Sequence, residues 1–446
     1  MQKHLLAFIA YFAIANTAFA VNYYVSPAGS DLNPGSFAKP WKTIAFALCG
    51  GGYGCSCSIK NLHKVGPGDT LFVRQGIYQE RDIGISNTGT TQKPIVIKSF
   101  QGEKAIVDAQ RTGRVFDIGM FNPSANLVID GLQIMNGLID GIRLGYNHMV
   151  KNVVIQNCRF SGHSFAPGEN CAAIQILNSA RNVVIRRCVI NGDTAITNQN
   201  YCGIQIWRND GSVQISDCEI RFTVTGIFYK HCSLGNNQTI IKNNFVHDNS
   251  GNGLWLSSNR VLVRNNLIIN NGNSGIIIWE DAGGTGGSNS KIDHNTLFNN
   301  HYTLNICAGG QYNQLTNDHG ARNDTVINNV LFGNNGEYGS FSIWAYAPDS
   351  FFVNNPPDEI SNYNCYYNSI SNSVFRLQNK FYSLPAWQAT SMQDLQSVQE
   401  QPVFANISKK MDSIEDFKII GGKAKKAAQD GSDLGADISL VLEKTK

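Results

Sequence analysis

The fold of this chain is decided by a repeated segment, which reads Val153-Val-Ile-Gln-Asn-Cys-Arg-Phe160, Val183-Val-Ile-Arg-Arg-Cys-Val-Ile190 and Val213-Gln-Ile-Ser-Asp-Cys-Glu-Ile220. The same pattern continues with Asn in place of Cys. These later copies are Thr239-Ile-Ile-Lys-Asn-Asn-Phe-Val246, Val261-Leu-Val-Arg-Asn-Asn-Leu-Ile268, Ser290-Lys-Ile-Asp-His-Asn-Thr-Leu297 and Asp324-Thr-Val-Ile-Asn-Asn-Val-Leu331. An aliphatic residue, a Cys or Asn three positions on, and an apolar residue two further on recur in every copy.

The repeat predicts short strands joined by a turn that every coil shares. Period-2 aliphatic residues of the β-branched type indicate strands with one buried face. Asparagines stacked at the strand spacing of about 4.8 Å can hydrogen-bond along the stack and hold the bend. The cysteines of the same column are therefore expected to be small buried core residues rather than catalytic thiols. This column contains Cys158, Cys188, Cys218, Asn244, Asn266, Asn295 and Asn329.

A second strand recurs after each turn, as in Gly203-Ile-Gln-Ile-Trp207, Gly226-Ile-Phe-Tyr-Lys230 and Gly275-Ile-Ile-Ile-Trp279. The strands recur without helical periodicity, and the L-x-x-L-x-L signature of leucine-rich repeats is absent. The chain is therefore predicted to be an all-β, right-handed parallel β-helix, a solenoid in which each coil contacts its neighbours.

The two ends of the repeat predict the domain organisation. Pro40 to Leu48 has helix-like spacing and is expected to form an N-terminal capping helix. Residues 21–345 are predicted to be the β-helix domain with this cap, and residues 346–446 the final coils and an irregular C-terminal packing tail. Within the latter, Tyr382 to Gln388 is expected to be a short helix or a loop.

The first 20 residues are predicted to be a cleavable signal peptide. Lys3 and His4 precede an apolar run, and Ala18-Phe19-Ala20 is a typical cleavage site. The run is shorter than the roughly 20 apolar residues that a membrane span needs, and no later segment approaches that length. We therefore expect a secreted or periplasmic protein cleaved after Ala20, without a membrane span.

Charge and cysteine content narrow the possible partners. A net charge of +3 without a dense basic block makes nucleic acid an unexpected partner. Of the 11 cysteines, Cys49, Cys55 and Cys57 lie in a Gly-rich stretch and are expected to staple a loop, with their connectivity left open. A monomer is expected.

The outward positions of the second strand predict a ligand-binding face. One outward column contains Arg143, Gln205 and Trp255, and the next contains Trp207 and Trp279; these five are the predicted substrate-binding residues. Exposed tryptophans usually mark a binding surface. Sugar rings stack on aromatic faces, and basic side chains pair with the carboxylates of an acidic glycan. The alternative is that loops after Ser233 and Ala282 cover the tryptophans as ordinary packing.

If the ligand is a uronate polymer, β-elimination needs a base, a cation beside the carboxylate and a proton donor. The predicted catalytic residues are Lys230, Arg208 and His231. Lys230 is the candidate base, since its two basic neighbours disfavour its charged form. Arg208 could neutralise the carboxylate, as could Ca²⁺ held by Asp248, Glu280 or Asp281. Glycoside hydrolysis needs two separated carboxylates, and the consecutive Glu280 and Asp281 make a poor pair.

The ends of the chain carry a family resemblance. Tyr23-Tyr-Val-Ser-Pro-Ala-Gly-Ser-Asp31, Pro40-Trp41 and Gly66-Pro-Gly-Asp-Thr-Leu-Phe-Val-Arg-Gln-Gly-Ile-Tyr78 resemble the N-terminal signature of secreted right-handed parallel β-helix proteins. These include the family 9 polysaccharide lyases, which are pectate lyases. The tail segments Asp416-Phe-Lys-Ile-Ile420 and Asp433-Leu-Gly-Ala-Asp437 resemble the corresponding ending.

The resemblance implies that one strand carries the catalytic lysine, but the calcium ligands of the family are mostly missing from this sequence. Gly226-Ile-Phe-Tyr-Lys230 is similar to the G-F-x-x-K strand that carries the catalytic lysine of family 9 lyases. Those enzymes have an Asp-Asp-Gly-x-Asp calcium cluster in the next coil. The matching stretch here, Asp248-Asn-Ser-Gly-Asn-Gly253, lacks most of these carboxylates.

These observations lead to one leading hypothesis and two alternatives. The first is an exported polysaccharide lyase that cleaves an acidic, uronate-containing glycan by β-elimination. The second is a non-catalytic glycan-binding or surface-adhesion protein on the same scaffold, and the third is a glycoside hydrolase.

Overall fold

A computed structural model describes most of the chain. The described residues are 20–48, 65–85, 87–164, 166, 168, 170–196, 200–232, 238–279, 287–309, 321–334, 339–345, 358–406, 411 and 413–442. The predicted signal peptide up to Phe19, the cysteine cluster Cys49, Cys55 and Cys57, and the predicted metal ligands Glu280 and Asp281 lie outside the described residues.

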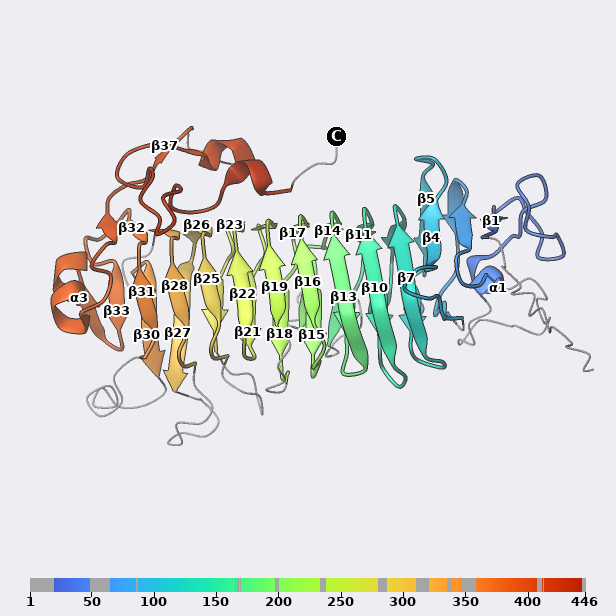
Figure 1. The fold of residues 1–446 in the computed structure, drawn as a ribbon, viewed down its shortest axis with the longest axis horizontal. Coiled ribbons are helices and arrows are strands. Elements are labelled where there is room, and N and C mark those ends of the chain that lie inside the picture. Colours follow the sequence, from blue (N-terminus) through green and yellow to red (C-terminus); the bar gives the residue numbers. More distant parts are fainter. Residues whose placement is uncertain are drawn as a thin grey trace, which may run out of the picture.

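Three long parallel sheets run along the molecule, and each coil adds one strand to a sheet (Figure 1). The first sheet consists of β1 (Asn22–Val25), β2 (Thr70–Val73), β4 (Ile95–Ser99), β7 (Ser124–Asp130), β10 (Val150–Gln156), β13 (Ala180–Arg186), β16 (Val213–Ser216), β19 (Thr239–Lys242), β22 (Val261–Arg264), β25 (Lys291–Asp293), β28 (Thr325–Ile327) and β31 (Ile360–Asn362). The second consists of β3 (Gly76–Tyr78), β5 (Ala105–Asp108), β8 (Gln133–Met135), β11 (Arg159–Ser161), β14 (Val189–Asn191), β17 (Glu219–Arg221), β20 (Phe245–His247), β23 (Leu267–Ile269), β26 (Thr296–Asn300), β29 (Val330–Gly333), β32 (Cys365–Asn368) and β35 (Val398–Gln399). The third consists of β6 (Phe116–Ile118), β9 (Ile142–Leu144), β12 (Cys171–Ile176), β15 (Tyr201–Trp207), β18 (Thr225–Lys230), β21 (Leu254–Ser257), β24 (Ser274–Ile278), β27 (Tyr302–Gly309), β30 (Phe341–Ala345), β33 (Phe375–Leu377) and the antiparallel β34 (Lys380–Tyr382). The right-handed parallel β-helix predicted from the repeat is confirmed.

The core consists of the aliphatic columns that the repeat predicts. Ile155 pairs in register with Ile129 and Ile185, and Ile185 with Ile215. All of them are fully buried, as is Phe160 at the equivalent inner position of the second sheet. The alternation of inward aliphatic and outward polar residues thus builds a continuous apolar interior.

The Cys/Asn column forms a hydrogen-bonded ladder inside the turn between the first and second sheets. The Asn244 Nδ2 atom donates to Asn266 Oδ1 (2.9 Å), and Asn266 Nδ2 donates to Asn295 Oδ1 (2.9 Å). The ladder continues through Asn329 to Asn364. Cys158, Cys188 and Cys218 are fully buried and form no disulfide, so they are core residues as expected. Burial raises the pKa of the Cys158 and Cys188 thiols well above the ordinary value, which makes them poor nucleophiles.

A second asparagine ladder lies in the turn between the second and third sheets. Asn249 Nδ2 donates to Asn271 Oδ1 (2.9 Å), and Asn271 Nδ2 donates to Asn300 Oδ1 (2.8 Å). Sequence reasoning missed this ladder, although its members follow the first ladder at a constant offset in the sequence.

Helices lie at both ends of the solenoid (Figure 1). The short helix α1 (Ile44–Leu48) buries Ile44, Ala47 and Leu48 in the main core, within the predicted helical stretch; its role as a cap stays an expectation. At the other end, α3 (Leu384–Ser391) buries Trp387 against Phe375, so the helical alternative for this stretch is correct. No helix among the described residues is long and apolar enough to cross a membrane.

The C-terminal tail folds back over the outer side of the second sheet (Figure 1, red). It contains the hairpin of β36 (Val403–Phe404) and β37 (Ile419–Gly421) and the 3₁₀ helices η1 (Ile414–Phe417) and η2 (Ile438–Leu440). Phe404 and Phe417 pack on Phe298, which points outward from β26. The coils themselves continue past residue 345 to β35, and the packing tail follows them.

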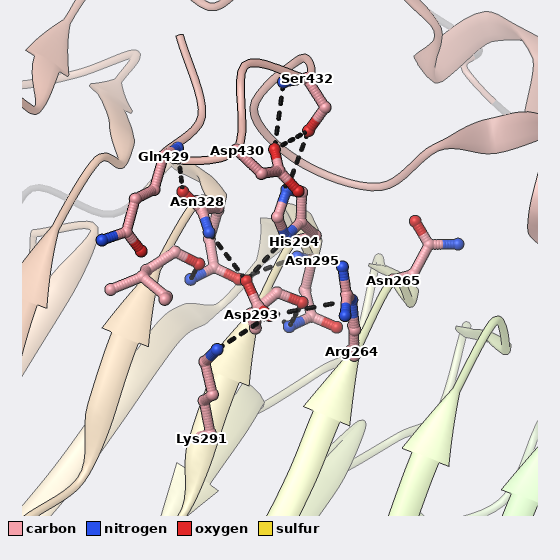
Figure 2. A network of polar contacts seen from close by, with 12 residues as sticks. Arg264, Asn265, Lys291, Asp293, His294, Asn295, Asn328, Gln429, Asp430 and Ser432 are labelled. Atoms are coloured by element: carbon pink, nitrogen blue, oxygen red, sulfur yellow. Dashed lines mark hydrogen bonds and ion pairs between the residues drawn. The ribbon is translucent and has the colours of Figure 1, made fainter.

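Polar contacts fix this tail to the turns of the coils (Figure 2). His294 lies between Asp293 (Nδ1 to Oδ1, 2.6 Å) and the tail residues Ser432 (Nε2 to Oγ, 3.0 Å) and Asp430 (Nε2 to Oδ1, 3.5 Å). Burial raises the pKa of Asp293, but hydrogen bonds from His294 and Asn328 outweigh this and hold it well below its ordinary value. The ionisable groups around His294 thus bind the C-terminal tail to the coils.

Candidate functional site

The outward columns predicted for the third sheet are present in the structure. Gln205 pairs in register with Phe228, and Phe228 with Trp255. Trp207 pairs with Lys230, and Lys230 with Ser257. The fold therefore places Lys230 next to Trp207 on the outer side of three neighbouring coils.

Lys230 is an unusual lysine because its side chain is held against the sheet. It ends β18 and is only 6% exposed. Its Nζ atom donates to Asn170 Oδ1 (2.8 Å) and lies 4.7 Å from the centre of the Phe228 ring. The cation–π contact and the amide hydrogen bond together orient the amine.

Asn170 supplies the oxygen that binds the Lys230 amine. It precedes β12, yet it reaches a lysine 60 positions further along the chain. Its backbone carbonyl also accepts a hydrogen bond from Gln175 Nε2 (3.1 Å). Sequence reasoning missed Asn170, since it lies outside the repeated strands and carries no periodic signal.

The aromatic residues stack on one another along the solenoid axis. The Trp255 ring lies between Phe228 (centroids 4.4 Å apart, 15° between planes) and Trp279 (5.6 Å, 11°). Its Nε1 atom donates to the carbonyl of Trp279 (3.1 Å). Both faces of Trp255 are therefore covered by other aromatic rings, and its role in substrate binding stays a prediction. Trp279 also contacts Trp344 (6.0 Å).

Two of the predicted substrate-binding residues are engaged in buried internal contacts. Arg143 forms a bidentate ion pair with Asp117 (Nη2 to Oδ2, 2.6 Å; Nε to Oδ1, 2.9 Å) and stacks on Tyr146 (4.2 Å). Gln205 is fully buried and accepts a hydrogen bond from Gln175 Nε2 (3.0 Å). Their polar groups thus have partners within the protein, and their role in substrate binding stays a prediction.

Arg208 and His231 lie in the turns that follow β15 and β18. Both have left-handed backbone conformations, with φ of 51° and 54°. Arg208 is exposed, and its guanidinium carbon lies 5.0 Å from the centre of the Trp207 ring. His231 is half-buried directly after Lys230. Trp207, Lys230, Arg208 and His231 thus lie in two neighbouring coils, and their catalytic and binding roles stay predictions.

The described residues do not fit a calcium site of the family 9 kind. Asp248 follows β20 in the second sheet rather than the third, and its Oδ2 atom lies 2.7 Å from His247 Nδ1. Asn249 belongs to the second asparagine ladder, and Asn252 Oδ1 accepts a hydrogen bond from the Ser274 amide. Within the described ranges, no three His, Cys, Asp or Glu residues are grouped to hold a metal. The predicted calcium site of Asp248, Glu280 and Asp281 stays a prediction, because Glu280 and Asp281 lie outside the described residues.

Sequence comparison connects the N-terminal coils to known proteins. Residues 23–187 match the family described as Pel9A-like, right handed beta helix region. A stretch of 107 residues, 24% of this chain, is 31% identical to the uncharacterized protein YwoF of Bacillus subtilis and covers 20% of it. A stretch of 111 residues, 25% of the chain, is 29% identical to the pectate lyase PEL9 of Emericella nidulans and covers 23% of it. The chain thus matches about a fifth of the length of these curated relatives.

Structural comparison extends the likeness over nearly the whole chain. The structure of the pectate lyase Pel9A superimposes with a TM-score of 0.57 at 13% identity, over 93% of this chain and 95% of that one. A mannuronic acid-specific family 6 polysaccharide lyase from human gut microbiota gives 0.50 at 13% identity, over 78% and 84%. At these identities the likeness establishes the fold. The chain shares the right-handed parallel β-helix fold of these structures, and the match to the family model ends before β18.

Proposed function

We propose that the protein is an exported polysaccharide lyase that cleaves an acidic, uronate-containing glycan, with Lys230 as the base. The observation that carries the proposal is the amine of Lys230, oriented by Asn170 and Phe228 on the outer side of the third sheet. Its strand is the one that resembles the G-F-x-x-K strand of family 9 lyases. Similarity in fold to proteins described as pectate and mannuronate-specific lyases supports the substrate class.

The reaction would be a β-elimination. A neutral Lys230 amine takes the proton from C5 of the uronate, the electron pair forms the C4–C5 double bond, and the C4–O bond breaks. The leaving oxygen takes a proton, and His231 is the nearest candidate donor in the sequence. Arg208 is exposed on the neighbouring coil, and in this proposal its guanidinium pairs with the substrate carboxylate. Since the described residues do not fit a calcium cluster, no step is assigned to a metal.

The burial of Lys230 favours a second candidate function. Lys230 is only 6% exposed and its amine is bound to Asn170, so in this conformation it offers little surface to a polymer. A non-catalytic glycan-binding or adhesion protein needs no such access, since Arg208 and the exposed edges of the aromatic rings could contact a glycan directly. The lyase proposal requires Asn170 to move away when substrate binds.

The formation of unsaturated product distinguishes the two functions. Purified protein is incubated with pectate, alginate and glycosaminoglycans, and the ultraviolet absorbance of the unsaturated ends is followed. We expect an increase with one acidic polymer, its loss in Lys230→Ala, and unchanged turnover in Lys151→Ala. Lys151 is a suitable control because it is an exposed lysine on β10 of the first sheet.

Binding of the same polymers is measured in parallel by affinity electrophoresis. Retained binding in Lys230→Ala together with lost turnover supports the role of a base. Binding without any absorbance change, for every polymer, would refute the lyase and favour the adhesion function.

A further inference from the structure

Asp69 is a buried carboxylate without a cationic partner among the described residues. It belongs to the Gly66-Pro-Gly-Asp-Thr motif just before β2 and is 8% exposed. Its Oδ2 atom accepts a hydrogen bond from the Gly66 amide (2.8 Å), and its Oδ1 atom accepts one from the Val21 amide (2.8 Å). Burying an ionised carboxylate is costly unless it is paired.

The partner of Asp69 is the backbone nitrogen at the predicted cleavage point. Val21 follows Ala20, the last residue of the predicted signal peptide, and directly precedes β1. Its carbonyl accepts a hydrogen bond from the Thr70 amide (3.0 Å), so Val21 continues the pairing of β1 with β2. The two contacts hold the Val21 nitrogen against the carboxylate.

We propose that removal of residues 1–20 completes an ion pair between the new α-ammonium group of Val21 and Asp69. Peptidase-catalysed addition of water breaks the Ala20–Val21 peptide bond, leaving a carboxylate on Ala20 and an ammonium group on Val21. At neutral pH this amine is mostly protonated, because ordinary α-amino groups titrate at about pH 7.7–8.0.

The ion pair secures the first coil of the solenoid. The terminal strand β1 pairs with β2 along its length, whereas on its other side the described backbone contacts begin at Tyr24, which bonds to Gly35 and Trp41. The start of β1, next to Val21, is therefore held by β2 and can fray while the rest of the β-helix stays folded. A hydrogen bond to a charged donor is stronger than one between neutral groups. Processing would therefore stabilise the end of the coil stack, independently of any activity toward glycans.

Four proteins test the proposal: chains that begin at Val21 or at Ala20, each with Asp69 or with Asp69→Asn. The additional Ala20 turns the Val21 nitrogen back into a neutral amide and moves the ammonium group one residue away. Hydrogen exchange of the β1 and β2 amides is measured by mass spectrometry. With Asp69 present, we expect exchange about tenfold faster in the chain that begins at Ala20. With Asp69→Asn, the two chains should exchange at the same rate.

An N-acetylated chain that begins at Val21 provides the test if Asp69→Asn fails to fold. It retains Asp69 and removes only the charge, so it should exchange as fast as the chain that begins at Ala20. Equal exchange in the Val21, Ala20 and acetylated proteins would overturn the ion pair. An exported protein whose first residue, by mass spectrometry, is not Val21 would overturn the processing step.

Discussion

The buried asparagine ladder offers a direct test of what holds the coils together. In Asn266→Ala, the Asn244 amide and Asn244 Nδ2 lose their acceptor (3.0 and 2.9 Å). The Ile241 carbonyl and Asn295 Oδ1 each lose a donor (2.9 Å in both cases). Leaving a buried group unsatisfied costs about 1–3 kcal/mol, and each of the other lost bonds about 1 kcal/mol. We expect the free energy of unfolding to fall by roughly 4 kcal/mol.

Two control variants separate the ladder from other effects of the substitution. Asn266→Cys introduces the residue that occupies this column in earlier coils, so it should cost less than Asn266→Ala because the thiol fills the space. Asn334→Ala removes an exposed hydrogen bond to Asn299 and should cost less than about 1 kcal/mol. Equilibrium unfolding in urea, followed by circular dichroism, measures all three.

The reasoning would be refuted if Asn266→Ala lost no more stability than Asn334→Ala. Equal costs would mean that backbone pairing alone holds the turn and that the buried amides contribute nothing net. A cost for Asn266→Cys as large as for Asn266→Ala would mean that the ladder depends on its hydrogen bonds rather than on filling the turn.

Two further predictions concern a buried histidine and the docked tail. His163 accepts from the Gly137 amide at Nδ1 (3.0 Å) and donates from Nε2 to the Ile134 carbonyl (2.9 Å), and burial lowers its pKa to about 4. This pKa lies below the unfolded value of about 6.5, so the contribution of neutral His163 to stability is complete above pH 6.5 and is lost as the pH falls toward 4, by about 3 kcal/mol. The urea midpoint of His163→Gln should therefore fall less on acidification than that of the wild-type protein. An identical pH dependence in both proteins would contradict the assignment. Gly435 has φ of 84°, and a Cβ atom there would lie 2.6 Å from Thr296 Oγ1. Gly435→Ala should therefore release the tail, which is detected as faster proteolytic cleavage after residue 430. Gly431 has a similar φ but open space around it, so Gly431→Ala should be cleaved more slowly than Gly435→Ala.

The fold was predictable because a solenoid repeats the same local problem in each coil. Ile155, Ile185 and Ile215 each fill the same inner position with an aliphatic side chain. A polar or missing side chain there would leave apolar surface unpacked between two coils. The Asn266 column could be read for the same reason, since a buried amide is tolerated only where a neighbour can bond to it. The ladder of Asn249, Asn271 and Asn300 carried an equally regular signal that the sequence reasoning overlooked.

The sequence by itself determined the solenoid, the registers that bring Trp207 beside Lys230, and the core identity of the column cysteines. Those follow from contacts between adjacent coils, which the repeat encodes. Only the tertiary structure decided how the outward residues are used. Trp255 is enclosed between two rings, Arg143 is neutralised by Asp117, and Lys230 is covered by Asn170. These contacts depend on loops and side-chain directions that do not repeat, so no period in the sequence records them.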